Sequence, residues 1–272
     1  RVAPIGILYL ASALTQKGHN VRVVDLIFSS DLKKDVASGV KEFNPDIAGV
    51  SVRNIDTLLS KQDYLVPDIK TCVESVRSCS QAIIIVGGSG FSIFPHELLV
   101  SLGADFGIVG EADNSLPLLA TALQENLDYT TIPGLVYRRG TDIIDNPPEF
   151  VEDLDALPFQ AIELIDYKRY NRKRGNLGVF TKRSCPHECI FCTERKIHGP
   201  RVRLRSPRRV VDEMEYIIRK TGVIHFDFAD ALFNFPRHHA MEVCREIVRR
   251  KVGCKFEVEL DPVDQDEESV KL

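Results

Sequence analysis

The stretch Cys185-Pro186-His187-Glu188-Cys189-Ile190-Phe191-Cys192 carries three thiols at spacings of four and three residues. Such spacing lets one tight loop direct three sulfur atoms at a single point. Soft thiolates at this density are typical ligands of an iron–sulfur cluster or of zinc. Three ligands leave one metal position open, so the chemistry depends on what occupies that position.

The segments around this loop alternate between expected strands and helices. Strands are expected at 177–181, 222–228 and 254–260, and helices at 207–220 and 237–251. The helix at 207–220 starts at Ser206-Pro207, with Pro at its first position. This βαβαβ order predicts a parallel sheet, and the cysteine loop follows its first strand. Three strands are too few to close a barrel, so we expect the N-terminal part of one.

The first half of the chain shows a similar alternation. Strands are expected at 21–24, 47–52, 83–86 and 106–109, and helices at 4–17, 31–43, 64–79, 95–102 and 114–126. This pattern predicts a mostly parallel sheet covered on both faces. A hairpin is expected at 134–144, and a proline-containing acidic segment follows. We therefore expect a domain at 1–130, a hairpin and linker at 131–174, and a second domain at 175–272.

Glycines and polar residues follow three of the expected strands in the first half. They are Ser51, Arg53, Gly87, Gly88, Ser89, Gly110 and Glu111. Ligands of such sheets bind at the carboxyl ends of the strands, and glycines let a ligand approach the backbone closely. Ordinary tight turns would explain any one of these sites, but the three together favour a shared ligand.

Composition and charge exclude several classes of protein. Hydrophobic residues make up 44% and charged residues 27%, as in ordinary globular proteins. The net charge of −4 makes nucleic acid an unlikely partner. No apolar run approaches the roughly 20 residues needed to span a bilayer. Seven cysteines, three of them clustered, argue against a secreted disulfide framework and for a reducing, cytoplasmic compartment.

The cysteine loop has three possible interpretations: packing residues, a zinc site or an iron–sulfur cluster. Three cysteines this close are rarely mere packing residues. A structural zinc site needs four ligands in paired spacings, and only His187 or His198 is near enough to supply the fourth. No second close pair of cysteines exists in the sequence. A 4Fe–4S cluster held by three thiolates, with its fourth iron free for a small chelating ligand, is favoured.

Cys185, Cys189 and Cys192, with Phe191 before the last thiol and a strand before the loop, resemble the motif of the radical S-adenosylmethionine enzymes. The resemblance implies that the three thiolates hold a 4Fe–4S cluster and that S-adenosylmethionine chelates the fourth iron. Phe191 would then pack near the adenine. It also implies a 5′-deoxyadenosyl radical, and a reductant protein such as flavodoxin or ferredoxin.

Four carboxylates of the second half are further candidates. Asp227 and Asp230 end an expected strand, where this family binds the methionine amino group or the substrate, and Asp230 is preferred. Glu257 and Glu259 share one face of a strand, and either could accept hydrogen bonds from ribose hydroxyls. A helix cap or a solvated surface position is the alternative for Asp227 and Asp230.

The first half is similar to the cobalamin-binding domain that is fused to many radical enzymes. Residues 4–14, 18–21, 86–95 and 109–113 carry this similarity. It implies that the glycines and the strand-end residues near Ser51 line the corrin and its nucleotide tail. The sequence lacks the Asp-x-His-x-x-Gly motif that provides a lower cobalt ligand in other cobalamin proteins, and His19 does not fit it.

The two resemblances imply an α/β protein with an N-terminal Rossmann-like cobalamin-binding domain and a partial (β/α) radical S-adenosylmethionine barrel. A first strand of the sheet and the later barrel strands are expected to lie outside this sequence. The implied activity is that of a class B methyltransferase-like enzyme, which methylates an unactivated carbon of a small molecule or natural product.

Three alternatives to methyl transfer remain at this point. The first is a cobalamin-dependent cyclisation or rearrangement without methylation. The second is a non-enzymatic metal-binding module. The third, a tRNA methylthiotransferase, needs a second cluster, for which Cys72 and Cys79 are too few and too separated.

Overall fold

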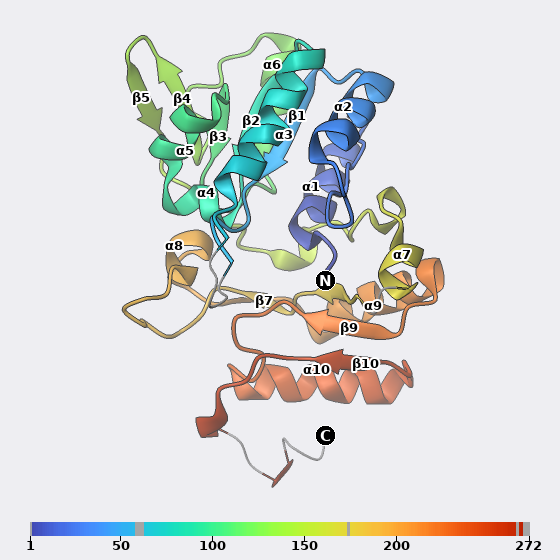
Figure 1. Ribbon diagram of the computed structural model, residues 1–272. Coiled ribbons are helices and arrows are strands. Elements are labelled where there is room, and N and C mark those ends of the chain that lie inside the picture. Colours follow the sequence, from blue (N-terminus) through green and yellow to red (C-terminus); the bar gives the residue numbers. More distant parts are fainter. Residues whose placement is uncertain (1, 58–62, 173–174, 265–266, 269–272) are drawn as a thin grey trace. The chain divides into compact units, whose positions relative to one another are not determined.

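The computed structural model describes residues 2–57, 63–172, 175–264 and 267–268 (Figure 1). The chain divides into two compact units. One contains residues 13–151, and the other contains residues 1–12 together with 152–272. The domain limits expected from the sequence, at 130 and 174, stay a prediction. Among the described residues, no helix is long and apolar enough to cross a bilayer.

The unit of residues 13–151 is built on a five-stranded sheet in the order β1-β2-β3-β4-β5. Its strands are β1 (Ile47–Ser51), β2 (Ile83–Gly87), β3 (Phe106–Ile108), β4 (Leu135–Arg139) and β5 (Asp142–Asp145). The first three strands are parallel, and β4 and β5 continue the sheet as an antiparallel hairpin. Ser51, Gly87 and Ile108 are in register, so the carboxyl ends of the parallel strands meet at one edge.

Helices cover both faces of this sheet. They are α2 (Leu32–Phe43), α3 (Val66–Cys79), α4 (Ser89–Ile93), α5 (Pro95–Leu102) and α6 (Ser115–Glu125), and Figure 1 shows α2 and α3 side by side. Alternate residues of a strand point to opposite faces. Ile84 and Val86 accordingly join a core with α2, α3 and α5, whereas Ile85 joins a second core with Leu119 of α6.

One local prediction for this unit was wrong. The strand expected at 21–24 is absent, because these residues have no neighbouring strand in the described part of the chain. Val24 instead lies over Gly39 of α2, where a Cβ would come within 2.7 Å of Val24 Cγ2. The segment after β2 forms the short helix α4, which was not predicted from the sequence.

The second unit contains a three-stranded parallel sheet in the order β10-β9-β6. Its strands are β6 (Leu177–Val179), β9 (His225–Phe228) and β10 (Lys255–Glu257), joined by the helices α9 (Pro207–Thr221) and α10 (Arg237–Arg250). Ser206 caps α9 by accepting a hydrogen bond from the Arg209 amide, as expected from the Ser-Pro start. Parallel strands in both halves confirm the predicted α/β fold.

Smaller elements complete the second unit. They are α7 (Tyr167–Arg172), α8 (Glu194–His198), β7 (Lys182–Arg183), β8 (Arg203–Leu204) and the short 3₁₀ turns Leu154–Ala156, Ile162–Leu164 and Pro262–Asp264. The helix α1 (Ile5–Gln16) contains the division at residue 12. Its first part belongs to this unit: the Ala161 amide donates to the Leu8 carbonyl, and the Ser12 hydroxyl donates to the Phe159 carbonyl.

Candidate functional site

The cysteine loop of the second unit follows β6 and the short strand β7, and it is closed at its base. Strands β7 and β8 pair in an antiparallel ladder on either side of the loop. Ser184 adopts a left-handed conformation, with φ of 74°, and its hydroxyl donates to the Gly199 carbonyl. Arg203 donates to the His198 carbonyl at 2.5 Å. The loop is therefore presented from a fixed base at the carboxyl end of a parallel strand, where α/β proteins bind ligands.

The three thiols differ in their exposure. Cys185 is buried, with 8% of its surface exposed, whereas Cys189 and Cys192 are exposed. The Cys192 amide donates to the Cys189 carbonyl at 3.0 Å, which places these two residues in one tight turn. Burial is the main cause that raises the pKa of the Cys185 thiol, and Cys192 and Cys189 raise it further.

The donor set of this loop fits an iron–sulfur cluster, because it offers three soft thiols on one loop. In the described part of the chain, no three His, Cys, Asp or Glu side chains are already gathered as a metal-binding group. The assignment of Cys185, Cys189 and Cys192 as cluster ligands therefore stays a prediction.

Other loop residues make contacts at the loop's rim. His187 Nε2 lies 3.1 Å from Asp261 Oδ2, and Asp261 is held by two hydrogen bonds to the Asn234 amide group. Glu188 forms an ion pair with Arg195. Phe191 is 87% exposed, so its ring is free to stack on a planar group. Its predicted contact with adenine stays a prediction.

Asp230 lies in a different environment from the one expected. Its side chain is fully buried, and its carboxylate accepts hydrogen bonds from the Thr181 amide at 2.7 Å and the Thr181 hydroxyl at 2.5 Å. The Lys182 ammonium lies 3.3 Å from the same carboxylate. These contacts use both oxygens of Asp230, and its predicted contact with S-adenosylmethionine stays a prediction.

The other carboxylate candidates lie near the carboxyl ends of β9 and β10. Asp227 and Glu257 are register partners on these neighbouring strands. Glu257 and Glu259 are both exposed, and the Glu259 carbonyl accepts a hydrogen bond from the Phe233 amide. The predicted contact of Glu257 or Glu259 with a ribose is not tested by this geometry and stays a prediction.

The glycines after β2 allow close packing of two backbone segments. Gly88 has φ of 100°, and a Cβ there would lie 2.8 Å from the Val52 carbonyl oxygen. A Cβ at Gly90 would lie 3.1 Å from the same oxygen, which accepts a hydrogen bond from the Gly90 amide. Ser51 and Arg53 are exposed at this edge. The close approach at Gly88 and Gly90 thus serves packing within the unit, and the exposed Ser51 and Arg53 are the groups that this edge offers to a ligand such as cobalamin.

Ser92 is a residue of this edge that the sequence did not single out. Its hydroxyl is fully buried, donates to the Gly88 carbonyl at 3.0 Å, and accepts from the Gly110 amide at 2.9 Å. It thereby joins the loops that follow β2 and β3. Glu111 is buried and accepts from the Val151 amide at 2.9 Å, so one of its oxygens has a structural partner. The cobalamin contacts predicted for Ser51, Arg53, Gly87, Gly88, Ser89, Gly110 and Glu111 stay predictions.

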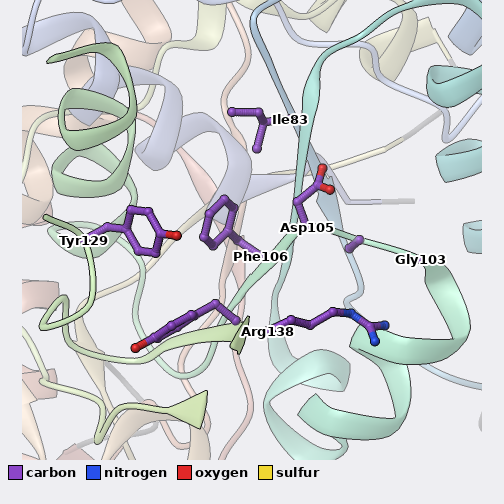
Figure 2. A pocket seen from close by; sticks show the side chains of 8 residues that line it. Ile83, Gly103, Asp105, Phe106, Tyr129 and Arg138 are labelled. Carbon is purple, nitrogen blue, oxygen red and sulfur yellow. The ribbon is translucent and has the colours of Figure 1, made fainter. Parts of the chain in front are cut away.

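A cavity of about 480 Å³ lies at the opposite edge of this sheet. It is lined at the starts of β2 and β3 by Ile83, Asp105 and Phe106, and Figure 2 shows Tyr129 beside Phe106. The Asp105 carboxylate already accepts hydrogen bonds from the Ile84 amide and from Arg77. This cavity is therefore separate from the carboxyl edge where the ligand was expected.

A buried ion pair that the sequence did not reveal lies in the second unit. Arg205 Nη1 and Glu213 Oε2 are 2.6 Å apart, and both side chains are fully buried. The Tyr9 hydroxyl donates to the same Glu213 oxygen at 2.7 Å. Arg205 also donates from Nη1 to the Phe180 carbonyl at 3.0 Å. The only sequence signal was a charged residue on the apolar side of α9.

Comparison with known proteins gives matches over most of the chain. Residues 1–120 match the family model of the B12-binding domain. The tryptophan 2-C-methyltransferase of Streptomyces laurentii is 28% identical, over 92% of this chain and 50% of the relative. The anaerobic magnesium-protoporphyrin IX monomethyl ester cyclase of a Synechocystis strain is 26% identical, over 93% of this chain and 50% of the relative. The chain spans about half the length of these curated relatives.

Solved structures show the same likeness. The radical S-adenosylmethionine methyltransferase TsrM from Kitasatospora setae, with tryptophan and an S-adenosylmethionine analogue bound, gives a TM-score of 0.88 at 29% identity, over 100% of this chain and 54% of TsrM. The cobalamin-dependent radical enzyme OxsB gives a TM-score of 0.79 at 20% identity, over 94% of this chain and 36% of OxsB, and this likeness shows the fold alone. Residues 1–120 therefore match a B12-binding domain, and the whole chain, with its cysteine loop and two parallel sheets, is similar to a radical S-adenosylmethionine methyltransferase that binds cobalamin and a 4Fe–4S cluster.

Proposed function

We propose that this chain is the cobalamin- and cluster-binding part of a radical S-adenosylmethionine methyltransferase, which methylates an unactivated carbon of a small molecule or natural product. The observation that carries the proposal is the position of the three-thiol loop. It follows β6 at the carboxyl edge of a parallel sheet, in a chain whose first 120 residues match a B12-binding domain. The relatives named as methyltransferases support the reaction class.

The proposal assigns each cofactor to a group of residues. Cys185, Cys189 and Cys192 hold a 4Fe–4S cluster, and the exposed ring of Phe191 stacks on the adenine of S-adenosylmethionine. The edge formed by the ends of β1, β2 and β3 holds cobalamin, and the exposed Ser51 and Arg53 side chains at this edge contact it. When bound, cobalamin supplies a transferable methyl group, and the cluster with S-adenosylmethionine supplies the one-electron chemistry that an unactivated carbon requires.

The proposal also includes a reductant and a compartment. A cluster of this kind needs an electron donor, for which a flavodoxin or ferredoxin is suited. We assign the enzyme to the cytoplasm, because three clustered free thiols persist in a reducing environment.

The metal content of the protein tests the cofactor assignment. Anaerobic purification and reconstitution is expected to give iron, sulfide and cobalt together, with a broad absorption band near about 400 nm. The variant with Cys185→Ala, Cys189→Ala and Cys192→Ala should lose the iron and this band. A matched control, Cys72→Ala with Cys79→Ala on α3, should keep both. Zinc in place of iron would contradict the assignment.

The products of the reaction separate methyl transfer from a second candidate. Ring closure is that candidate, because a relative named as an anaerobic magnesium-protoporphyrin IX monomethyl ester cyclase matches over 93% of the chain. Methyl transfer predicts a methylated product together with S-adenosylhomocysteine. The formation of 5′-deoxyadenosine without either of these would favour ring closure or rearrangement instead.

A further inference from the structure

Two charged side chains are buried at the base of the cysteine loop: Lys182 in β7, which leads into the loop, and Asp230, which follows β9. Lys182 and Asp230 are 1% and 0% exposed, and the ammonium and carboxylate are 3.3 Å apart. Removing two charges from water costs free energy, which their attraction offsets only when hydrogen bonds satisfy the remaining donors and acceptors. A buried pair of this kind is therefore stable only where other polar groups complete its hydrogen bonds.

Asp230 joins the chain beyond β9 to the chain beyond β6. The ladder between these strands ends at Val179 and Phe228, and the Ala229 amide adds one more hydrogen bond to the Val179 carbonyl. Beyond that point, the Asp230 carboxylate accepts hydrogen bonds from the amides of Thr181 at 2.7 Å and of Lys182 at 3.3 Å. These side-chain hydrogen bonds connect the two chain segments where the backbone hydrogen bonds between β6 and β9 end.

Lys182 makes the reciprocal connection. Its ammonium donates to the Phe233 carbonyl at 2.6 Å and to the Leu232 carbonyl at 3.3 Å, besides its contact with Asp230. An ammonium has three donors, so these three acceptors satisfy it. Lys182 also pairs with Leu204 in the β7–β8 ladder. The residue therefore fixes the entrance of the cysteine loop to the turn at 230–233.

A second anchor holds the same junction from the other side. The Thr181 carbonyl accepts from the Arg205 amide at 2.8 Å, and the Phe180 carbonyl accepts from the Arg205 guanidinium at 3.0 Å. The backbone of residues 180–182 is thus held from the ends of β8 and β9 together. Cys185 lies three residues further on and is the buried thiol of the three.

We propose that Asp230 and Lys182 are positioning residues, which set the direction in which the chain leaves β6 and thereby the place of the Cys185 sulfur. This inference rests on the proposed function, since it takes Cys185 as a cluster ligand. Cys189 and Cys192 lie on the exposed part of the loop, whereas Cys185 is buried. The surrounding fold therefore determines the position of the Cys185 sulfur more than that of the other two. In this role Asp230 does not contact S-adenosylmethionine.

The first test uses the metal-free protein. The variants are Asp230→Asn, Lys182→Met and Thr181→Val, with Asp212→Asn as a control that removes a charged partner of Arg250 away from the loop. Each is treated with iodoacetamide under native conditions, and alkylation is measured for each cysteine by mass spectrometry. Local opening should increase the rate at Cys185 about tenfold in Asp230→Asn and Lys182→Met, and less in Thr181→Val. Cys189 and the control should not change.

Thr181→Val keeps the charge pair and removes one hydroxyl donor, so it carries the test if a charge variant fails to fold. Unchanged protection of Cys185 in all folded variants would overturn the positioning role. This readout needs no cluster, so it decides the inference even if the wild-type protein binds no iron. Absence of iron in the wild type would overturn the proposed function separately.

The second test uses the reconstituted protein. All three variants should give a broadened electron paramagnetic resonance signal of the reduced cluster, and a smaller change of that signal on addition of S-adenosylmethionine. The control should behave as the wild type. A defect confined to Asp230→Asn, with Cys185 still protected, would show a direct ligand contact of Asp230 and would overturn the positioning role.

Discussion

At the level of single residues, a glycine in the unit of residues 13–151 allows a helix side chain to pack closely on the sheet. Phe91 is fully buried, and its ring lies over Gly107 of β3. A Cβ at Gly107 would come within 2.1 Å of the Phe91 ring, whereas a Cβ at Gly49 of β1 would meet nothing within 4 Å. The same residue type thus has a packing role at one strand position and none at another.

Gly107→Ala is expected to lower the free energy of unfolding by about 2 kcal/mol, because the Phe91 ring or the strand must move. Gly49→Ala, the matched control, should leave stability nearly unchanged or raise it slightly. Urea unfolding at equilibrium measures both. Equal effects of the two substitutions would show that the contact between Phe91 and Gly107 is not a constraint.

The buried pair of Arg205 and Glu213 leads to a second prediction at this scale. Glu213→Gln should destabilise the protein by about 3 kcal/mol, since it leaves the Arg205 charge without its partner. Arg205 Nε and Nη2 already lack partners among the described residues. Replacing both residues by Met and Leu should cost less than the single substitution. Denaturant unfolding of the three proteins checks this order.

At the scale of the element, charged side chains join α9 and α10 outside the core. Arg250 lies 2.6 Å from Asp212 of α9 and 2.7 Å from Glu246 on its own helix. Hydrogen bonds from Arg249, and then from Arg250, lower the pKa of Glu246 from 4.5 to about 2. The folded state therefore favours the ionised form of this carboxyl.

The pH dependence of stability follows from this shift. A lowered pKa in the folded state gives a contribution that is complete above the ordinary value of 4.5 and is lost as the pH falls toward about 2. Glu246→Gln should therefore destabilise the protein more at pH of about 6 than at pH of about 3. Urea unfolding at the two pH values measures the difference. A difference that is independent of pH would contradict the prediction.

At the scale of the whole molecule, residues 1–12 belong to the same compact unit as residues 152–272. The Tyr9 ring packs on Phe180 at 4.8 Å between centroids, and its hydroxyl donates to Glu213. The segment that begins the match to a B12-binding domain therefore also completes the core of the unit that bears the cysteine loop.

Tyr9→Ala tests this assignment in the intact chain. Hydrogen exchange should become about tenfold faster in α9 and in residues 176–181, because the substitution removes both the ring and the hydroxyl that contact them. Exchange in β1, β2 and β3 of the other unit should stay as in the wild type. Mass spectrometry of peptic fragments gives both measurements, and faster exchange only in β1–β3 would contradict the assignment.

Much of the fold could be predicted, because the pattern of apolar and polar residues within each segment indicates whether that segment is a strand or a helix. The alternation of apolar runs and helical patterns gave the parallel strands β1, β2, β3, β6 and β9 and the helices between them. The predicted strand at 21–24 does not form, because a strand also needs a neighbouring strand to hydrogen-bond with, and the residues of the segment itself do not show whether one is present. Lys182 and Asp230 were not recognised as a pair, because 48 residues separate them in the chain.

Residue types and their spacing are enough to identify the chemical groups of this protein: three thiols at spacings of four and three, and glycines at the ends of parallel strands. These features act within a few residues, so they can be recognised without the fold. Which polar groups remain available to a ligand depends on contacts between residues that are distant in the chain. The carboxylates of Asp230 and Glu111 are buried and accept hydrogen bonds from residues distant in the sequence. Phe191, Cys189 and Cys192, in contrast, are exposed on the cysteine loop.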